Sequence, residues 1–417
     1  MTTAPPAELR LSLLAPRGSS TDVGALLGWS NTTGIPFELS RRETLSTLSQ
    51  RILRDLWLRA DAASVALAYW LRRSSIDRLA EAFARRQDLE PDTVFVPVGR
   101  VFHVAPGNVD TIFVYSWALS YLCGNQNIVR VSGHQSDVLS SLLAVLSDMM
   151  TTDAALEAGN RFLTYDHDQS LSAELSLWAT HRVVWGGDET VSLFRAMPLS
   201  PHASERAFGS KFSYSVLSAP AVCAAADDAM AALASGFFND IFWFDQMACS
   251  SPHLIAWIGP PAVADAAIDR LHAALEREIE RRGHRGSPSS AVHRLNYAFD
   301  LACDTELRVG LDNREFLGVR LGEGEVWRKP MCGGGLFTHV RADRLDAVAS
   351  IASQRDQTVT HFGFSREELR SLAQIAGAKG VDRFVPVGEA LAFDVIWDGF
   401  DLIGDFVRRV TVRLRNA

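Results

Sequence analysis

The chain has no excess of basic residues. Its 417 residues include 41 Lys and Arg against 49 Asp and Glu, which gives a formal net charge of −8. Proteins that bind nucleic acids neutralise phosphate groups with a basic surface, so this balance argues against that class. A short basic cluster at 281–285 lies beside Gly and Ser and is typical of a solvated loop.

Paired cysteines and long apolar runs are also lacking. The five cysteines include no C-x-x-C pair and no His-rich spacing, which argues for a reducing compartment and against disulfides or structural zinc. The longest apolar run, at 111–123, is too short to span a bilayer. The first residues show no basic region followed by an apolar core, as a signal peptide would. We therefore expect a cytoplasmic protein that binds neither a metal ion nor a membrane.

Neither common phosphate-binding fingerprint occurs, because the chain contains no G-x-G-x-x-G and no Walker A sequence. A nucleotide, if it binds, is therefore held in another way. What the chain does contain, after amphipathic helical patterns at 44–59 and 77–86, is an alternation of apolar β-branched runs and helix-like segments. Strands are expected at 93–106, 127–132, 161–165 and 181–187. Helices are expected between them, at 110–123, 136–150 and 170–179.

Such β-α-β units predict a parallel sheet, whose ligands bind at the carboxyl ends of the strands. This rule places Asn108, Ser132, Gly186 and Gly187 at a functional rim. The alternation restarts after Gly209, with strands expected at 212–217 and 253–259. Helices are expected at 222–234, about 237–247, 261–282 and 342–354. Residues 283–290, rich in Gly, Ser and Pro, form the clearest predicted loop.

Cys249 is the first candidate for chemistry. Free cysteines most often act as small buried hydrophobes, and that interpretation stays open for Cys249. It lies, however, between a helix-like segment and a predicted strand, in a turn with Ser250, Ser251 and Pro252. Backbone N–H groups in such a turn stabilise a neighbouring anion and lower the pKa of a thiol. The other four cysteines lack this setting.

Asn108 and the two glycines admit two interpretations each. Asparagine after Gly107 suits a tight turn, yet an amide at the end of a parallel strand also suits an oxyanion site. Gly186 and Gly187 suit either a plain β-α turn or the close approach of a cofactor. Histidines 103, 253 and 361 are more often structural than catalytic in apolar sequence. His253 is kept as a candidate proton donor because it lies four residues after Cys249.

Six segments, in the same order, resemble the acyl-CoA reductases of the LuxC type, a family of the aldehyde dehydrogenase superfamily. The resemblance covers residues 90–402, and its most specific parts are FDQMACSSPHLI (244–255) and DRFVPVGEALAFDVIWDGFDL (382–402). The other segments are GRVFHVAPGNVD (99–110), LCGNQNIVRVS (122–132), VVWGGDETV (183–191) and FGSKFSYSV (208–216). The resemblance implies an α/β, aldehyde-dehydrogenase-like fold, with a Rossmann-like cofactor domain and an α/β catalytic domain, both built on parallel sheets.

The resemblance also divides the chain into four parts. They are a helical segment packing on the cofactor domain (1–90), an NAD(P)-binding domain (91–215), a catalytic domain (216–380) and a C-terminal segment suited to oligomerisation (381–417). A homo-oligomer is expected from the superfamily. The implied nucleophile is Cys249 and the implied oxyanion donor is Asn108. The implied cofactor-binding residues are Ala105, Pro106, Arg130, Ser132, Gly186 and Gly187.

Two departures from the superfamily pattern refine the expected activity. Arg130 stands where a lysine usually contacts the cofactor ribose or its 2′-phosphate, and arginine grips phosphate with two hydrogen bonds, which favours NADPH over NADH. Aldehyde-oxidising members have a water-activating glutamate, whereas the matching position here is Ala207, in the stretch AFGSK at 207–211. Without that base, an acyl-cysteine intermediate is protected from water and available for reduction.

We therefore expect NAD(P)H-dependent reduction of an acyl-CoA or acyl-carrier-protein thioester to an aldehyde, through an acyl group on Cys249. An acyl-transferring or aldehyde-consuming enzyme is the expected partner. Two alternatives stay open at this point. One is a cysteine acyltransferase or thioesterase on the same fold, and the other is a non-catalytic subunit that binds an acyl carrier.

Overall fold

The computed structural model describes most of the chain and divides it into two compact units. The described residues are 11–18, 23–30, 33–133, 136–166, 168–312, 315–322 and 332–413. The first unit consists of Met1–Gly209 with Phe393–Ala417, and the second of Ser210–Ala392. The expected boundaries at 215 and 380 differ from this division, because the strands at 212–218 and 383–386 pair within the sheet of the second unit.

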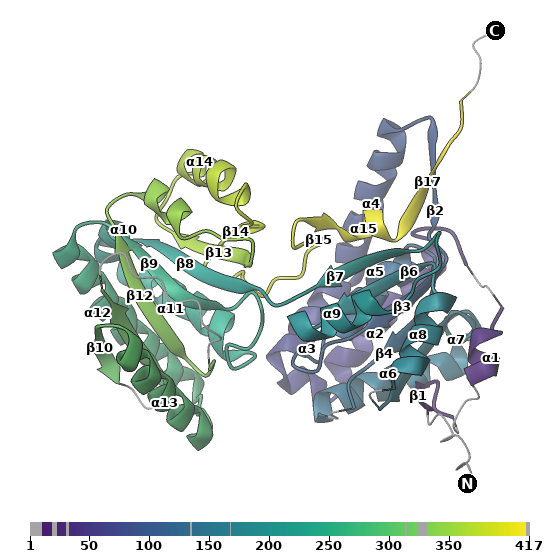
Figure 1. Cartoon of the computed structure of the whole chain (residues 1–417), viewed down its shortest axis with the longest axis horizontal. Helices are drawn as coiled ribbons and strands as arrows, with labels where there is room; N and C mark the ends of the chain where they lie inside the picture. The colour runs from purple at the N-terminus through teal and green to yellow at the C-terminus, as the bar shows by residue number, and fades with distance from the viewer. Residues whose placement is uncertain are drawn as a thin grey trace, which may run out of the picture. The chain divides into compact units, whose positions relative to one another are not determined.

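The first unit is built on a six-stranded sheet in the order β1-β5-β4-β3-β6-β7 (Figure 1). Its strands are β1 (Leu11–Ala15), β3 (Arg100–Val104), β4 (Gln126–Arg130), β5 (Asn160–Tyr165), β6 (His181–Trp185) and β7 (Ser204–Phe208). Five of them are parallel, and β1 joins the edge antiparallel to β5. The parallel sheet predicted from the sequence is thus confirmed, whereas β1 and β7 were missed.

Helices connect these strands and cover the sheet. The connecting helices are α5 (Ile112–Leu122), α6 (Asp137–Thr152), α7 (Ala154–Gly159), α8 (Gln169–Trp178) and α9 (Asp188–Ala196). Every residue of α5 is buried, which explains its mostly apolar sequence. The N-terminal helices are α1 (Val23–Leu27), α2 (Leu39–Arg54), α3 (Ala62–Leu71) and α4 (Arg73–Leu89), with a 3-10 turn at Leu58–Ala60. Helix α2 packs on α3, α4, α5 and α6.

The prediction of a single strand at 93–106 is wrong. This stretch forms two strands, β2 (Thr93–Pro97) and β3, and β2 pairs with β17 (Val407–Thr411) in a separate two-stranded sheet. The division falls at Gly99, whose φ is +116° and where a Cβ atom would lie 2.9 Å from the Thr180 hydroxyl oxygen. Both observations favour glycine at this position. The short elements β15 (Ile396–Trp397), β16 (Phe400–Asp401) and α15 (Leu402–Asp405) precede β17.

The second unit is built on a seven-stranded sheet in the order β10-β11-β12-β9-β8-β13-β14. Its strands are β8 (Phe212–Ser218), β9 (Pro252–Ile258), β10 (Leu307–Asp312), β11 (Leu317–Leu321), β12 (Leu336–Ala342), β13 (Asp356–Phe362) and β14 (Arg383–Pro386). All neighbours are parallel except β10 and β11. Its helices are α10 (Ala219–Ala224), α11 (Asp227–Phe242), α12 (Pro261–Arg282), α13 (Pro288–Asp304) and α14 (Arg366–Gly377).

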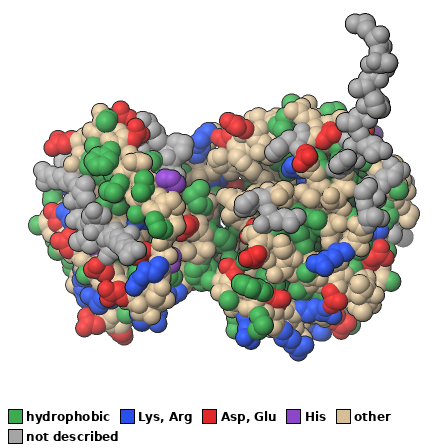
Figure 2. All heavy atoms as spheres, turned by 90° about the horizontal axis from the view of Figure 1, so that it is seen from below, with side chains coloured by type: hydrophobic (Ala, Val, Ile, Leu, Met, Phe, Trp, Pro, Cys, Tyr) green, Lys and Arg blue, Asp and Glu red, His purple; other side chains and the backbone are tan. Residues whose placement is uncertain are grey.

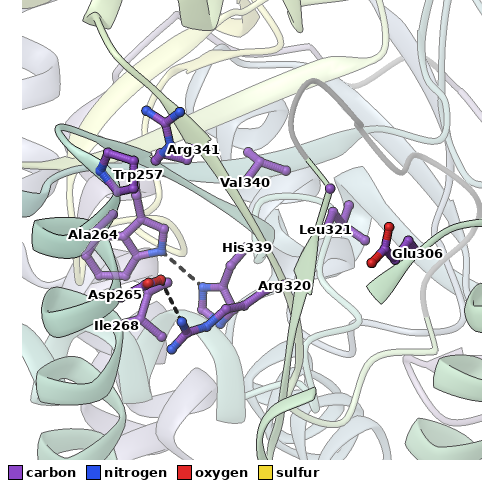
Figure 3. A pocket seen from close by; sticks show the side chains of 12 residues that line it. Trp257, Ala264, Asp265, Ile268, Glu306, Arg320, Leu321, His339, Val340 and Arg341 are labelled. Carbon is purple, nitrogen blue, oxygen red and sulfur yellow. Dashed lines mark hydrogen bonds and ion pairs between the residues drawn. The ribbon is translucent and has the colours of Figure 1, made fainter. Parts of the chain in front are cut away.

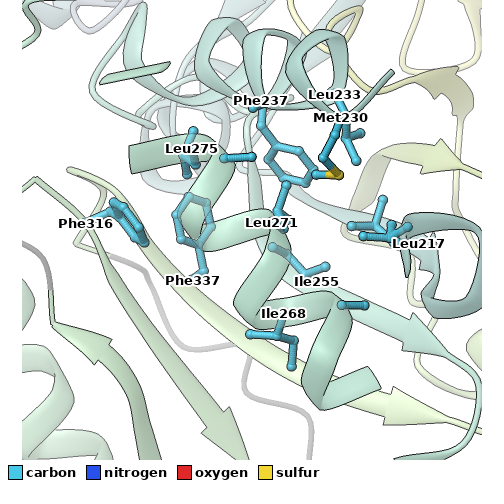
Figure 4. Close-up of a cluster of buried hydrophobic side chains, with 14 of the residues drawn as sticks. Leu217, Met230, Leu233, Phe237, Ile255, Ile268, Leu271, Leu275, Phe316 and Phe337 are labelled. Atoms are coloured by element: carbon cyan, nitrogen blue, oxygen red, sulfur yellow. The ribbon is translucent and has the colours of Figure 1, made fainter. Parts of the chain in front are cut away.

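Several apolar clusters form the core of the second unit, and two of them pack on its central strands. Side chains of α11 and α12, such as Phe237 and Leu271, pack on Ile255 and Phe337 from one side of the sheet (Figure 4). Tyr214, Val359 and residues of α14 belong to the second cluster. Strands buried in this way read as continuous apolar runs, which is why β8 and β9 were found from the sequence.

Three other stretches of the second unit were predicted only in part. The expected helix 342–354 is the end of β12 followed by a 3-10 helix, η2 (Leu345–Ser350). The expected helices at 222–234 and 237–247 are instead a short α10 and one long α11. Helix α13 begins at Pro288, inside the predicted loop, with the Ser287 side chain capping its first turn.

The surface of the described residues carries mixed charge. On the face in Figure 2, acidic and basic side chains are interspersed with hydrophobic ones. Among the helices that the structure describes, none has the length and apolar character needed to cross a membrane.

Candidate active site

The carboxyl ends of β3 and β6 bring several predicted site residues to one place. The two strands are neighbours, with Val104 paired to Val184, and the chain order of the sheet reverses between them. Such a reversal point is where open α/β sheets bind their ligands. Ala105–Asn108 follow β3, and Gly186–Gly187 follow β6. The structure therefore places Ala105–Asn108 and Gly186–Gly187 side by side at the carboxyl ends of the strands, as expected.

Ser132 joins this group from the end of β4. A Cβ atom at Gly107 would lie 3.0 Å from Ser132 Oγ, so the loop after β3 passes directly over this serine. Asn108, next to Gly107, is exposed. The small residue at 107 thus permits a close approach between two neighbouring loops, and leaves the side-chain amide of Asn108 accessible.

Arg130 is the last residue of β4. Its guanidinium lies 4.8 Å from the centre of the Tyr165 ring, a cation–π contact that orients the side chain. The buried Nε atom of Arg130 has no hydrogen-bond partner among the described residues. An unsatisfied buried N–H is costly, and an anionic group of a ligand would satisfy it. Arg130 therefore fits the phosphate-binding role implied by the resemblance.

The two glycines after β6 have a packing explanation as well. A Cβ atom at Gly186 would lie 2.9 Å from the side chain of Thr190, and the Gly186 N–H donates to the carbonyl of Phe208. Gly187 is the N-cap of α9, whose first turn contains Asp188 and Glu189. These acidic residues already interact favourably with the helix N-terminus. Packing alone thus accounts for Gly186, and its role toward a cofactor remains a prediction.

Cys249 lies in the turn between α11 and β9, at the amino ends of the strands of the second sheet. The turn is held by Gln246, which is fully buried and has a φ of +62°. Its Nε2 donates to the carbonyls of Pro252 and Leu336 at 2.8 and 2.9 Å, and its Oε1 accepts from the N–H groups of Gly335 and Leu336 at 3.0 Å each. All four bonds of one amide therefore tie this turn to β9 and β12.

The glycines at 333–335, together with Gln246, form a clamp that holds the cysteine turn. The Gly334 N–H donates to the carbonyl of Asp245 at 2.7 Å, and a Cβ atom at Gly333 would lie 2.7 Å from that same oxygen. All three glycines have positive φ angles. Their backbone thus approaches the cysteine turn more closely than other residues allow.

Two further strands contact Cys249 directly. Ser213 Oγ, on β8, donates to the Cys249 carbonyl at 2.7 Å and accepts from the Thr358 N–H at 3.2 Å. Gln357, on β13, donates from Nε2 to the Cys249 sulfur at 3.3 Å. Sequence reasoning missed Gln246, Gln357 and Ser213, because each comes from a segment distant in sequence or carries no motif. Cys249 itself is half-buried, which suits a reactive thiol.

His253, in β9, is half-buried, and burial lowers its pKa to about 4. Its buried Nδ1 atom has no hydrogen-bond partner in the described part of the chain. The imidazole is therefore neutral at pH 7, and its role as a proton donor remains a prediction. His103 is buried between Ser116 Oγ and Asn127 Oδ1, and burial lowers its pKa to about 3, as expected of a structural residue.

Asp240 adds a titratable group near the turn. It is buried on α11, where burial raises its pKa to about 7 against the opposing hydrogen bonds from the N–H groups of Gly388 and Ala390. Its backbone carbonyl accepts from Ser251 Oγ at 2.7 Å. Asp240 therefore joins the cysteine turn to the loop after β14.

The aromatic residues before Cys249 pack mainly into the core. Phe242 belongs to the cluster of α11 and α12, and its ring centre lies 4.7 Å from that of His284. Helix packing thus explains Phe242.

A cavity of about 380 Å³ lies elsewhere in the second unit (Figure 3). It is lined by residues at the carboxyl ends of β9, β11 and β12, including Trp257, Arg320 and Arg341. Beside it, Trp257 Nε1 donates to His339 Nδ1 at 3.1 Å, and His339 contacts His272. Cys249 belongs to the amino ends of this sheet, so the cavity is not part of its surroundings.

Comparison with solved structures identifies the fold. Methylmalonate-semialdehyde dehydrogenase from Oceanimonas doudoroffii superimposes with a TM-score of 0.66 at 12% identity, covering 100% of this chain and 97% of that one. Aldehyde dehydrogenase 21 from Physcomitrella patens gives a TM-score of 0.66 at 10% identity, covering 94% and 89%. The expected aldehyde-dehydrogenase-like α/β fold is confirmed.

Sequence comparison identifies the family. A long-chain acyl-protein thioester reductase of Vibrio harveyi is 32% identical over 299 residues, and one of Aliivibrio fischeri is 25% identical over 295 residues. Each match covers 70% of this chain and 59% of the relative, so the chain spans about three fifths of the length of these proteins. The model of the family described as acyl-CoA reductase (LuxC) matches residues 78–409. Because that match covers most of the chain, the protein belongs to the acyl-CoA reductase (LuxC) family.

Proposed function

We propose that the protein reduces an acyl thioester, carried by CoA or by an acyl carrier protein, to an aldehyde. The observation that carries this proposal is the clamped turn that presents a half-buried Cys249 with a hydrogen-bond donor at its sulfur. The relatives named as acyl-protein thioester reductases support the same reaction class.

In this proposal the Cys249 thiolate attacks the thioester carbonyl. A C–S bond to the enzyme forms, the bond to the carrier thiol breaks, and that thiol leaves with a proton. The Cys249 backbone N–H and the side-chain amide of Asn108 are the proposed donors to the oxyanion, an interaction worth roughly 3–4 kcal/mol per donor elsewhere. After reduction the thiohemiacetal on Cys249 collapses, which releases the aldehyde and restores the thiolate.

A reduced nicotinamide, when bound, supplies the hydride that converts the acyl group to the aldehyde level. The proposed residues that hold it are Ala105, Pro106, Arg130, Ser132, Gly186 and Gly187. The unpartnered Nε of Arg130 and the close fit of Gly107 over Ser132 agree with a bound phosphate-bearing ligand at this edge. We propose NADPH as the preferred cofactor, with NADH as the alternative, because arginine binds a 2′-phosphate bidentately.

Hydrolysis of an acyl group on Cys249 lacks an activating base at residue 207. Ala207 lies in β7 and carries no base, and the nearby Lys211 is engaged with Asp382 at 2.9 Å. Without a carboxylate at 207 to activate water, an acyl group on Cys249 is not directed toward hydrolysis.

Thioester-dependent oxidation of NADPH is the direct test of this function. Purified protein is mixed with NADPH and a panel of short, medium and long acyl-CoA and acyl-carrier thioesters, and the absorbance of the reduced nicotinamide is followed. We expect oxidation that depends on the thioester and yields one aldehyde per NADPH. Thiol release without NADPH oxidation would instead favour the acyltransferase or thioesterase alternative, and no reaction with any thioester would contradict the reductase.

Replacing Arg130 by alanine tests the cofactor assignment. We expect KM for NADPH to rise about tenfold and KM for NADH to change little, because a charge-assisted phosphate contact is lost. Quenching of tryptophan fluorescence by NADPH should weaken in parallel, which measures binding apart from turnover. Arg161→Ala is the matched control, since Arg161 also makes a cation–π contact, with Trp29, but lies near the amino end of β5. Equal losses for both cofactors would contradict the 2′-phosphate role.

A further inference from the structure

Gln357 is a polar side chain at the candidate nucleophile that no motif predicted. It is the second residue of β13, only 3% of it is exposed, and its Nε2 lies 3.3 Å from the Cys249 sulfur. The contact joins segments 108 positions apart in the sequence. It exists because β13 pairs with β8 and β8 pairs with β9, so the amino ends of the three strands meet at the cysteine turn.

In the contact between Gln357 and Cys249, the amide is the hydrogen-bond donor and the sulfur is the acceptor. An amide N–H donates, so the sulfur accepts, and a thiolate is a much better acceptor than a neutral thiol. A hydrogen bond to the charged form favours that form. Glutamine also does not titrate, so it lends this support at every pH at which the protein is folded.

The backbone of Cys249 is held separately from its sulfur. Ser213 Oγ donates a hydrogen bond to the Cys249 carbonyl and accepts one from the N–H of Thr358, which follows Gln357 in the chain. Gln246 fixes the turn as a whole. Neither of these contacts reaches the sulfur, whereas the Gln357 amide acts on the reacting atom itself.

We propose that Gln357 is a further residue of this active site, which stabilises the Cys249 thiolate through its side-chain amide and keeps the sulfur in position for attack. The inference rests on the proposed function for the identity of the nucleophile, but its geometry does not depend on which acyl group reacts. In this proposal Gln246 and Ser213 hold the backbone of the cysteine turn, whereas Gln357 stabilises the negative charge on the sulfur.

The test measures the reactivity of Cys249 without any thioester or cofactor. The rate of alkylation by iodoacetamide is determined from pH 5.5 to 9.5, and the peptide containing Cys249 is quantified by mass spectrometry. In Gln357→Met, which preserves the volume, we expect about tenfold slower alkylation at pH 7 and a profile displaced upward by about one pH unit. The exposed Cys303 in the same protein is an internal reference, whose profile should not move.

Two more variants separate charge stabilisation from a general loss of structure. Gln357→Glu keeps the shape but removes the donor, and it should displace the Cys249 profile upward at least as far. Thr360 lies on the same strand β13, and its hydroxyl contacts that of Ser215 on β8. Thr360→Val removes this contact and should leave the profile unchanged. If Gln357→Met proves poorly folded, the Gln357→Glu profile decides the question.

Two outcomes would overturn the inference. A Cys249 profile in Gln357→Met and Gln357→Glu that coincides with that of the native protein shows that the amide does not act on the thiolate. A downward displacement shows that the amide oxygen, not its nitrogen, faces the sulfur. If the upward displacement is found but no thioester is ever reduced, the Gln357 assignment stands and the proposed reaction fails.

Discussion

Replacing Cys249 by alanine is expected to abolish both turnover and the formation of an acyl-protein adduct. Removal of a nucleophile that acts within a catalytic group lowers kcat by about 10⁴-fold or more in well-studied enzymes. The side chain of alanine forms no bond to the acyl carbon, so no intermediate accumulates. NADPH oxidation measures the first loss, and the intact mass of the protein after incubation with a thioester measures the second.

The matched control for this variant is Cys223→Ala. Cys223 lies near the end of α10 in the second unit and is also half-buried, and its thiol donates to the carbonyl of Val263 in α12. Its loss should leave both the adduct and the rate close to those of the native protein. Activity that survives in Cys249→Ala, or an adduct that persists there, would show that another residue is the nucleophile.

Acidification from pH 7.5 to 5 is expected to destabilise both units. Burial lowers the pKa of His103 to about 3 and that of His181 to about 4, both in the first unit. In the second unit it lowers the pKa of His253 and His272 to about 4 and that of His339 well below 6.5. These histidines are neutral when folded.

The sign of the effect follows from proton binding. The unfolded chain takes up protons as the pH falls through about 6.5, while the folded histidines do not, so unfolding becomes more favourable. Each histidine then contributes a loss of about 2 kcal/mol at pH 5. Asp240 opposes this in the second unit, because its raised pKa of about 7 makes the folded state bind a proton over the same range. The total in the first unit is a large part of a typical stability of about 5–15 kcal/mol.

Urea denaturation at pH 7.5, 6 and 5, followed by tryptophan fluorescence, measures this dependence. His103→Gln, whose amide can replace the contacts to Ser116 and Asn127, should remove about 2 kcal/mol of the pH-dependent part. His293→Gln, at an exposed position of α13, is the control and should not alter it. Equal denaturation midpoints at pH 7.5 and 5 in the native protein would contradict the expectation.

Much of the architecture could be predicted from the sequence because buried parallel strands leave continuous apolar runs. Strands β4, β5, β6, β8 and β9 were located this way, and the α/β class followed from their alternation with helices. Strand β12 was missed, because its apolar run is short and lies between three glycines and a 3-10 helix, and the helix expected at 342–354 covers mainly that 3-10 helix. Strand β2 was merged with β3 because a single glycine separates two apolar runs.

The candidate site could be predicted only in part, because some of its residues act through contacts that the sequence does not show. Cys249 and Asn108 carry their chemistry in their own side chains and lie in recognisable turns. Gln246 and Gln357 act through contacts with residues 90 and 108 positions away, and a single glutamine gives no local signal of such a contact. Positioning residues of this kind become visible only when the strand order is known.

The two parallel sheets share one winding, since β5-β4-β3-β6-β7 and β12-β9-β8-β13-β14 have the same chain order. The candidate residues nevertheless lie at opposite ends of the strands: at the carboxyl ends in the first sheet and at the amino ends in the second. Strands at a carboxyl end lead into helix N-termini, which attract anions, whereas Cys249 lies in the turn before β9 and is not at a helix N-terminus. A thiolate in that position depends on individual donors, so its nucleophilicity can be tuned by changing one side chain at a time.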